Sequence, residues 1–382
     1  MKYRLVSLLS LGHMMTDMTQ GVIPVLLPFL IPVHHLSYAA AAGIVFAGTV
    51  FSSLVQPLFG HFSDRLSKPW LIPMGVLVSG LGVAVIGVVP SYNLILLVVA
   101  ASGLGVAAYH PEAARYANYV AQENKATSMS IFGAGGQIGF AVGPLLTTAL
   151  VLSLGLKGTL ALAFPTVLVG MILAWQVSRF SFFVERATKK GGPSGGAGHD
   201  QWAAFFRLSG GVFCRSIIFY SLNTFVPLYW INVLHQSNAA GATALTLLFT
   251  AGVVGNIVGG RLGDTFGLRS TILSGFCGLS ILLPLFVSTP NVLLANVLLV
   301  VIGLFHYITY SPVVLMAQTY LPNHVGLASG VTFGLAVTIG GVASPLLGLI
   351  ADHHGIPAAL WSVAFLPLVA IGLSLTLPHP KG

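Results

Sequence analysis

Charge is what this sequence has least of. Of its 382 residues, 16 are Lys or Arg and 8 are Asp or Glu, so charged residues make up 6% of the chain. Soluble domains carry about 25% charged residues, and here hydrophobic residues make up 55%. A water-soluble surface cannot be built from so few charges, which indicates a protein whose main solvent is lipid.

Three further absences narrow the function. The only cysteines, Cys214 and Cys277, lie in apolar runs, which excludes a disulfide framework and a zinc site. The Walker A and His-Glu-x-x-His motifs are absent, so ATP-driven pumping and zinc-dependent hydrolysis lack their chemistry. The net charge of +8 is spread along the chain without the compact basic patch that nucleic-acid binding needs. We therefore expect that the protein is not an enzyme and that it has no metal site, no cofactor and no nucleic-acid partner.

What the sequence does contain is apolar runs, each near the ~20 residues that a helix needs to cross the hydrocarbon core. Their loops are short, and lipid admits only helices or closed barrels, for whose strands these runs are too long. The sequence predicts an all-α membrane protein with twelve transmembrane helices, over residues 5–33, 39–59, 70–89, 93–116, 126–151, 157–180, 207–234, 240–262, 268–289, 291–317, 324–350 and 356–377.

One segment interrupts this pattern. Residues 185–206 begin with a Gly-rich, polar stretch that has no apolar periodicity, and such composition is typical of a flexible linker. We expect an N-terminal six-helix bundle over residues 1–184, a linker over residues 185–206, and a C-terminal six-helix bundle over residues 207–382.

The basic residues predict the orientation. Fourteen of them fall at the two termini or in the even-numbered loops, whereas the opposite side has only Lys157. Because Lys and Arg concentrate on the cytoplasmic side of membrane proteins, both termini and the linker are expected in the cytoplasm. No Asn-x-Ser/Thr sequon occurs, which fits a prokaryotic protein. We expect a monomer in a bacterial plasma membrane.

The two halves of the chain repeat with an offset of about 200 residues. Parallel six-helix repeats are an architecture of secondary transporters, whose substrate site lies between the halves near the membrane midplane. Each matching pair occupies the same place in its half. The pairs are Gly60 to Asp64 with Gly260 to Asp264, Pro111 with Pro312, and Pro144 to Leu146 with Pro345 to Leu347.

The first of these pairs carries a family resemblance. Gly60, Asp64, Arg65 and Lys68 match most of a Gly-x-x-x-Asp-Arg-x-Gly-Arg-Arg signature, although Ser67 and Pro69 depart from it, and Gly260 and Asp264 keep part of it in the second half. With this signature the chain resembles the major facilitator superfamily over essentially its whole length. The resemblance implies two pseudo-symmetric six-helix bundles that transport a solute by alternating access.

The resemblance also assigns a role to the loop. It implies that Asp64 meets the positive N-terminal end of a helix beginning near Val325 and so favours the outward-facing state, which is consistent with the interaction of an anion with a helix dipole. The alternative is that Asp64, Arg65 and Lys68 only cap and orient the loop.

Two further segments narrow the resemblance. Gly139, Gly143 and Pro144 resemble a motif of twelve-span exporters that exchange a drug for protons, although glycines at this spacing could equally serve helix packing. The stretches from Leu11 to Asp17 and from His110 to Arg115 resemble the fosmidomycin-resistance branch. These resemblances favour export of a drug-like or small organic-anion solute.

Away from the ends of the spans, ionisable side chains fall on spans one, four, seven and ten, which the family resemblance says line a central cavity. Such groups are costly in lipid and usually face a cavity or a partner. They are His13 and Asp17 in span one, His110, Glu112 and Arg115 in span four, Arg215 in span seven, and His306 in span ten.

Span one offers a proton site. His13, Asp17 and Gln20 recur at intervals of three to four residues, which places them on one helical face. Desolvation makes a carboxylate near the midplane easier to protonate, so Asp17 is our candidate for proton coupling, with His13 tuning it. The alternative is that Asp17 makes a structural hydrogen bond. Glu112 could couple protons or pair with Arg115, three residues on.

The cations and neutral polar groups predict a substrate site. Arg215 and Arg115 are planar donors that suit a carboxylate or a phosphonate. We therefore expect a proton-coupled exporter of a drug-like or organic-anion solute, driven by a proton gradient; a proton-coupled importer of an anionic nutrient and a non-transporting receptor are the alternatives. The further substrate-binding candidates are His110, Gln20, Asn223, Tyr220, His306 and Tyr310.

Overall fold

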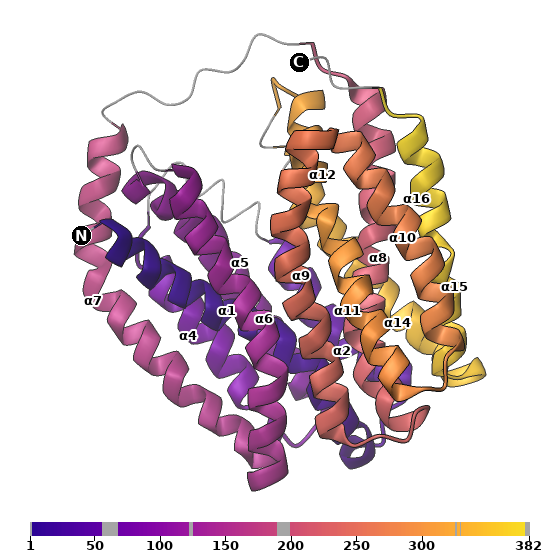
Figure 1. The fold of residues 1–382 in the computed structure, drawn as a ribbon. Helices are drawn as coiled ribbons and strands as arrows, with labels where there is room; N and C mark the ends of the chain where they lie inside the picture. Colours follow the sequence, from indigo (N-terminus) through magenta and orange to yellow (C-terminus); the bar gives the residue numbers. More distant parts are fainter. Residues whose placement is uncertain are drawn as a thin grey trace. The chain divides into compact units, whose positions relative to one another are not determined.

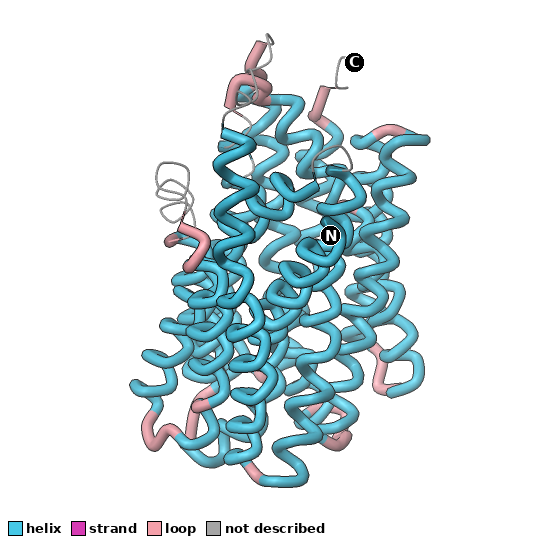
Figure 2. Tube along the Cα trace, turned by 90° about the vertical axis from the view of Figure 1, so that its left-hand side faces the viewer, coloured by secondary structure: helices cyan, strands magenta, loops and turns pink. Residues whose placement is uncertain are grey.

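The computed structural model describes residues 2–55, 68–121, 125–188, 199–324, 327–328 and 330–378. Every regular element in these ranges is a helix (Figure 2). Among the described residues, eleven helical segments are long and apolar enough to cross a membrane, and α2 (Tyr38–Leu54) is a shorter apolar helix at the place of the second predicted span. The predicted all-α class is thus confirmed.

The chain forms two compact units. The first comprises Met1–His35 and Ile44–Pro193, and the second comprises Leu36–Gly43 and Ser194–Gly382. The boundary between Pro193 and Ser194 lies within the segment predicted as a linker. Helical structure enters that segment from both sides, because α7 continues to Thr188 and α8 begins at Trp202.

In the first unit α1 is the central helix, packed mainly against α6 and also against α5, α4 and α7. It contains three prolines at intervals of four, Pro24, Pro28 and Pro32. Figure 1 shows these helices in indigo to magenta. Their bounds are α1 (Lys2–His34), α4 (Leu71–Ala84), α5 (Tyr92–Ala121), α6 (Lys125–Leu154) and α7 (Ala163–Thr188), with short 3-10 turns at Ile86–Val88 and Leu156–Leu162.

In the second unit two of the predicted spans are each divided into two helices. The breaks fall at Thr309 and Phe365, two or three residues before Pro312 and Pro367, whose missing N–H groups interrupt the helical hydrogen bonds. The helices are α8 (Trp202–Asn232), α9 (Asn238–Phe266), α10 (Leu268–Ser288), α11 (Val292–Ile308), α12 (Tyr310–Tyr320), α14 (Ala336–His354), α15 (Ile356–Ala364) and α16 (Leu366–Leu375), with a π-helical turn over Gly330–Leu335.

The Gly-x-x-x-Gly-Pro motif lies where α6 packs on α1. A Cβ atom at Gly139 would meet the backbone of Met14 and Met18, and one at Gly143 would lie 2.8 Å from the Met18 carbonyl oxygen. Small residues allow such close helix approach. In the second unit Gly340, 201 residues after Gly139, contacts α8 in the same way, so the repeat in the sequence is a repeat in helix packing.

Asp352, at the end of α14, caps the start of α2. Its Oδ1 accepts a hydrogen bond from the Tyr38 N–H at 2.6 Å, and its Oδ2 accepts one from the Ala39 N–H at 3.0 Å. The first N–H groups of a helix have no partner within the helix and need an external acceptor. Gly348 allows the close approach, because a Cβ there would collide with Ala39. These contacts explain why Leu36–Gly43 belongs to the second unit.

Asp352→Ala is expected to destabilise the protein by about 1–2 kcal/mol, since a lost N-terminal cap has this magnitude. Thermal unfolding in detergent micelles should show a Tm lower by a few degrees. Asp352→Asn keeps one acceptor oxygen, so its Tm should lie between that of the wild type and that of Asp352→Ala. Asp264→Ala removes an exposed carboxylate at the end of α9 and should leave the Tm unchanged; equal values for all three variants would contradict the cap.

Candidate functional site

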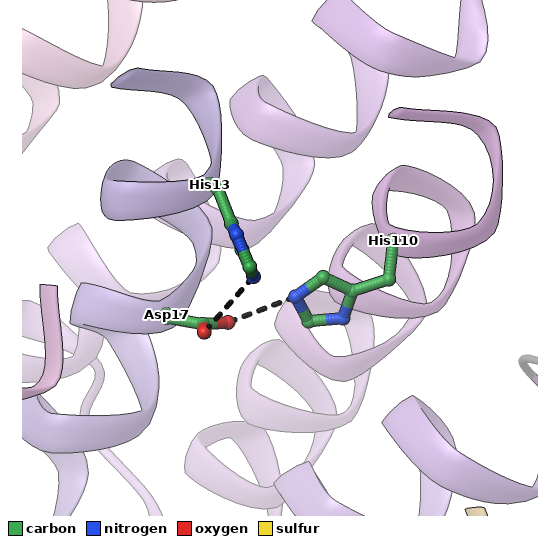
Figure 3. A group of neighbouring side chains, drawn as sticks. All are labelled: His13, Asp17 and His110. Carbon is green, nitrogen blue, oxygen red and sulfur yellow. Dashed lines mark hydrogen bonds and ion pairs between the residues drawn. The ribbon is translucent and has the colours of Figure 1, made fainter. Parts of the chain in front are cut away.

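Three ionisable side chains of the first unit form one cluster, which we call the His–Asp–His cluster: His13, Asp17 and His110. His13 and Asp17 lie one turn apart on α1, and His110 approaches from α5 (Figure 3). Asp17 Oδ1 lies 2.9 Å from His110 Nε2, and Asp17 Oδ2 lies 3.2 Å from His13 Nε2. The Asp17 residue is 9% exposed, so both of its oxygens are used within the protein.

The second nitrogen of His13 determines what this cluster can bind. His13 Nδ1 lies 2.8 Å from the carbonyl oxygen of Phe132 on α6. A carbonyl can only accept, so Nδ1 carries a hydrogen. A neutral His13 therefore presents the lone pair of Nε2 to the Asp17 carboxylate. Two acceptors that face each other at this distance need one further proton between them.

The charge of the cluster changes with that proton. His110 Nε2 can donate to Asp17 Oδ1 while its ring is neutral. Without the further proton the cluster then carries one negative charge, and with it the cluster is neutral. Since a buried charge is costly, loading one proton removes a penalty. His110 was predicted to bind substrate, and the structure places its Nε2 against Asp17 Oδ1.

The further contacts that the structure describes around the cluster come from uncharged groups. From α6, Gly136 faces it, and a Cβ there would collide with Asp17 Oδ2 and His13 Nε2. From α5, the Tyr109 hydroxyl donates to the Leu9 carbonyl of α1. Within the described ranges, no Lys or Arg forms an ion pair with Asp17.

The His–Asp–His cluster is also the one group in the described ranges whose candidate ligand atoms lie close enough to hold a metal ion, all within 4.8 Å of one another. Two imidazole nitrogens and a carboxylate oxygen occur together in divalent metal sites. A metal ion and a proton would compete for the same atoms, so an assay of proton binding here needs a chelator control.

Glu112 makes a different set of contacts. It is fully buried, and its Oε1 accepts from Arg115 Nη2 at 3.1 Å and from the backbone N–H of Lys68 at 2.9 Å. These are the contacts that the structural-pair alternative predicts, and they occupy Arg115 within its own helix. The predicted loop residues Gly60, Asp64 and Arg65, and Val325, lie outside the described residues.

In the second unit Arg215 is a half-buried cation whose described neighbours are hydroxyl, carbonyl and aromatic groups. Its Nε donates to Thr309 Oγ1 at 3.0 Å, and the guanidinium lies over the rings of Tyr310 and Tyr307, at 4.9 and 5.8 Å from their centroids. No carboxylate of the described chain forms an ion pair with Arg215. Aromatic faces offset part of its charge, and an anion would offset the rest.

His306 of α11 adds unsatisfied polar atoms beside Arg215. The Nε of Arg215 also donates to the His306 carbonyl at 3.4 Å, and the His306 ring stacks on Phe219 with centroids 5.7 Å apart. His306 is 2% exposed, and neither ring nitrogen has a hydrogen-bond partner among the described residues. A neutral imidazole always carries one N–H, so a buried donor is left unpaired, at a cost that a bound acceptor would remove.

The remaining predicted residues lie along the same helices. Tyr220 and Asn223 are buried on α8, one and two turns past Arg215, and Asn223 Oδ1 has no partner among the described residues. Gln20 is half-buried on α1, one turn past Asp17. Gly260 and Asp264 lie near the end of α9, where Asp264 is exposed.

Sequence reasoning missed three contributors. They are the Phe132 carbonyl, Gly136 and Thr309. Thr309 lies between His306 and Tyr310 in the sequence, so its position was a usable signal. The Phe132 carbonyl gave none, because every residue carries one and only the packing of α6 on α1 selects it.

Comparison with known proteins agrees with this architecture. A family model described as Major Facilitator Superfamily matches residues 9–345, with a second match over residues 208–382. The chain is 30% identical to the uncharacterized MFS-type transporter YfnC of Bacillus subtilis (strain 168), over 99% of this chain and 94% of that protein. It is 28% identical to the fosmidomycin resistance protein of Escherichia coli (strain K12), over 98% of this chain and 92% of that protein.

A solved structure shows the same fold. The crystal structure of a bacterial homolog to the human lysosomal transporter Spinster, in an inward-facing and unoccupied conformation, superposes with a TM-score of 0.82. It is 18% identical and covers 98% of this chain and 96% of that chain.

Proposed function

Since the chain belongs to the major facilitator superfamily, whose members are transporters and not enzymes, we propose that it is a proton-coupled antiporter that exports a small organic anion or drug-like solute. It works by alternating access as a monomer in a bacterial plasma membrane, with both termini in the cytoplasm. The proton gradient supplies the energy, and no cofactor takes part.

The contact between His13 and Asp17 carries this proposal. Because His13 Nδ1 is bound to a carbonyl, its Nε2 and Asp17 Oδ2, 3.2 Å apart, are two acceptors that need one proton. Asp17, His13 and His110 therefore share the coupled proton. Glu112, whose carboxylate is already held by Arg115 and the Lys68 N–H, serves the structure.

Arg215 supports the anionic substrate. Its charge pairs with no carboxylate among the described residues, and neither His306 ring nitrogen has a described partner, so both side chains offer donors to one carboxylate or phosphonate group. Neutral contacts from Tyr310, Tyr220 and Asn223 complete the site. The similarity to a fosmidomycin resistance protein favours export of such a solute over import.

Purified protein in liposomes distinguishes antiport from symport by the sign of an imposed pH gradient. With an acidic lumen, an antiporter accumulates solute inside while protons leave. A panel of carboxylates and phosphonates, with amphipathic cations as controls, should give such accumulation for anions only. Accumulation with an alkaline lumen would show symport and overturn the export proposal. Transport lost in EDTA and restored by a divalent metal would show that the cluster binds a metal ion.

A further inference from the structure

A cavity lies between the start of α1 and the end of α7 in the first unit, away from the sites described above. It measures about 460 Å³ and is lined by Arg4, Leu5 and Leu8 of α1 and by Gln176 and Arg179 of α7. Two cations thus face one small cavity with an apolar wall, and we call this cavity the basic groove. We propose that the basic groove binds the headgroup of an anionic phospholipid.

The two arginines of the groove have no acidic partner among the described residues. Both are exposed, and Arg179 Nη1 donates to Gln176 Oε1 at 3.0 Å. In the second unit, by contrast, Arg207 and Arg269 donate to backbone carbonyls near the end of α16. The guanidinium groups of the basic groove can therefore bind an external anion.

The surface of α7 leads from lipid into the groove. Phe164, Leu168, Met171 and Trp175 recur at intervals of three to four residues and are 45–84% exposed, and Arg179 follows one turn later. In a membrane this apolar face contacts acyl chains, and tryptophan is enriched at the headgroup level. Acyl chains along α7 would place a phosphate at Arg179 and Arg4.

This continuity selects a lipid rather than a soluble phosphate. A free anion gains nothing from the exposed apolar face, whereas a phospholipid uses the face and both cations. Arg4 and Arg179 belong to the membrane side on which the sequence concentrates its basic residues. The cytoplasmic leaflet carries anionic lipids, and basic pockets between helices on this side bind their headgroups.

Lipid titration of the full-length protein in detergent tests the groove. Native mass spectrometry should show phosphatidylglycerol binding to the wild type more tightly than phosphatidylcholine. Arg4→Gln/Arg179→Gln should weaken phosphatidylglycerol binding about 25-fold and Arg179→Gln alone about fivefold, since each basic residue near an anionic lipid contributes roughly a factor of five. Arg261→Gln, an exposed arginine near the end of α9, is the matched control and should bind as the wild type does.

Three results would overturn the proposal. They are unchanged phosphatidylglycerol affinity in the double variant, an equal loss in Arg261→Gln, and competition by millimolar inorganic phosphate as effective as that by phosphatidylglycerol. The double variant and the wild type should have the same Tm in detergent micelles that contain phosphatidylcholine. This result would show that the double variant is folded and has lost only its lipid binding.

Discussion

Asp17→Asn is expected to abolish the coupling of transport to the pH gradient. Asparagine keeps the size of the side chain but removes the negative charge that lets the His–Asp–His cluster hold a further proton next to His13 Nε2. The solute ratio that an imposed pH gradient sustains across a liposome membrane should fall to about 1, because no proton is exchanged. Radiolabelled solute in liposomes measures this ratio.

Exchange of labelled for unlabelled solute, with no pH gradient, is the control. It needs a folded carrier but no net proton movement, so Asp17→Asn should retain it. Glu112→Gln is the second control: it weakens a structural pair with Arg115 and lowers stability, but the molecules that remain folded should stay coupled. If the Asp17→Asn variant still accumulated solute in response to a pH gradient, the assignment of the coupled proton to Asp17 would be refuted.

Arg215→Gln is expected to weaken binding of the anionic solute at least about 100-fold. The substitution removes the side-chain cation that contacts Tyr310, Thr309 and His306, and losing one partner of a buried ion pair costs about 3–5 kcal/mol. Arg215→Lys keeps the charge but loses the Nε donor and the planar arrangement of donors. Its Kd should therefore lie between that of the wild type and that of Arg215→Gln. Equilibrium binding of the labelled solute to purified protein gives each Kd.

Arg207→Gln is the matched control for this series. Arg207 lies two turns earlier on α8, is exposed and donates to the Thr376 carbonyl, so its loss should leave the Kd unchanged. Binding of a neutral analogue should be insensitive to every substitution at Arg215. If Arg215→Gln bound the anion as tightly as the wild type, the anion site would lie elsewhere.

Much of the architecture follows from the sequence because its causes are local. Helices in lipid need long apolar runs, and charges are costly there. The number of spans and the helices that carry ionisable residues could therefore be predicted from the sequence. The pair of Glu112 with Arg115 followed from a spacing of three residues on one helix. The helix breaks before Pro312 and Pro367 could also have been read, since proline has no N–H to donate.

The contacts that complete the sites depend on tertiary packing instead. Asp352 caps Tyr38 across 314 residues, and neither helix signals the other. His110 lies on a predicted cavity helix, but only the packing of α5 against α1 directs its Nε2 to Asp17. The Phe132 carbonyl fixes the hydrogen on His13, and a backbone atom leaves no trace in residue identity.

The three prolines of α1 restrict how this helix can move. Pro24, Pro28 and Pro32 have no N–H, so the carbonyl groups four residues before each of them lose their helical donor. These carbonyls form one row on α1 that continues the line of Asp17 and Gln20. Bare carbonyls cannot face hydrocarbon. Through a transport cycle α1 can therefore tilt or slide, but it cannot turn this face toward the bilayer.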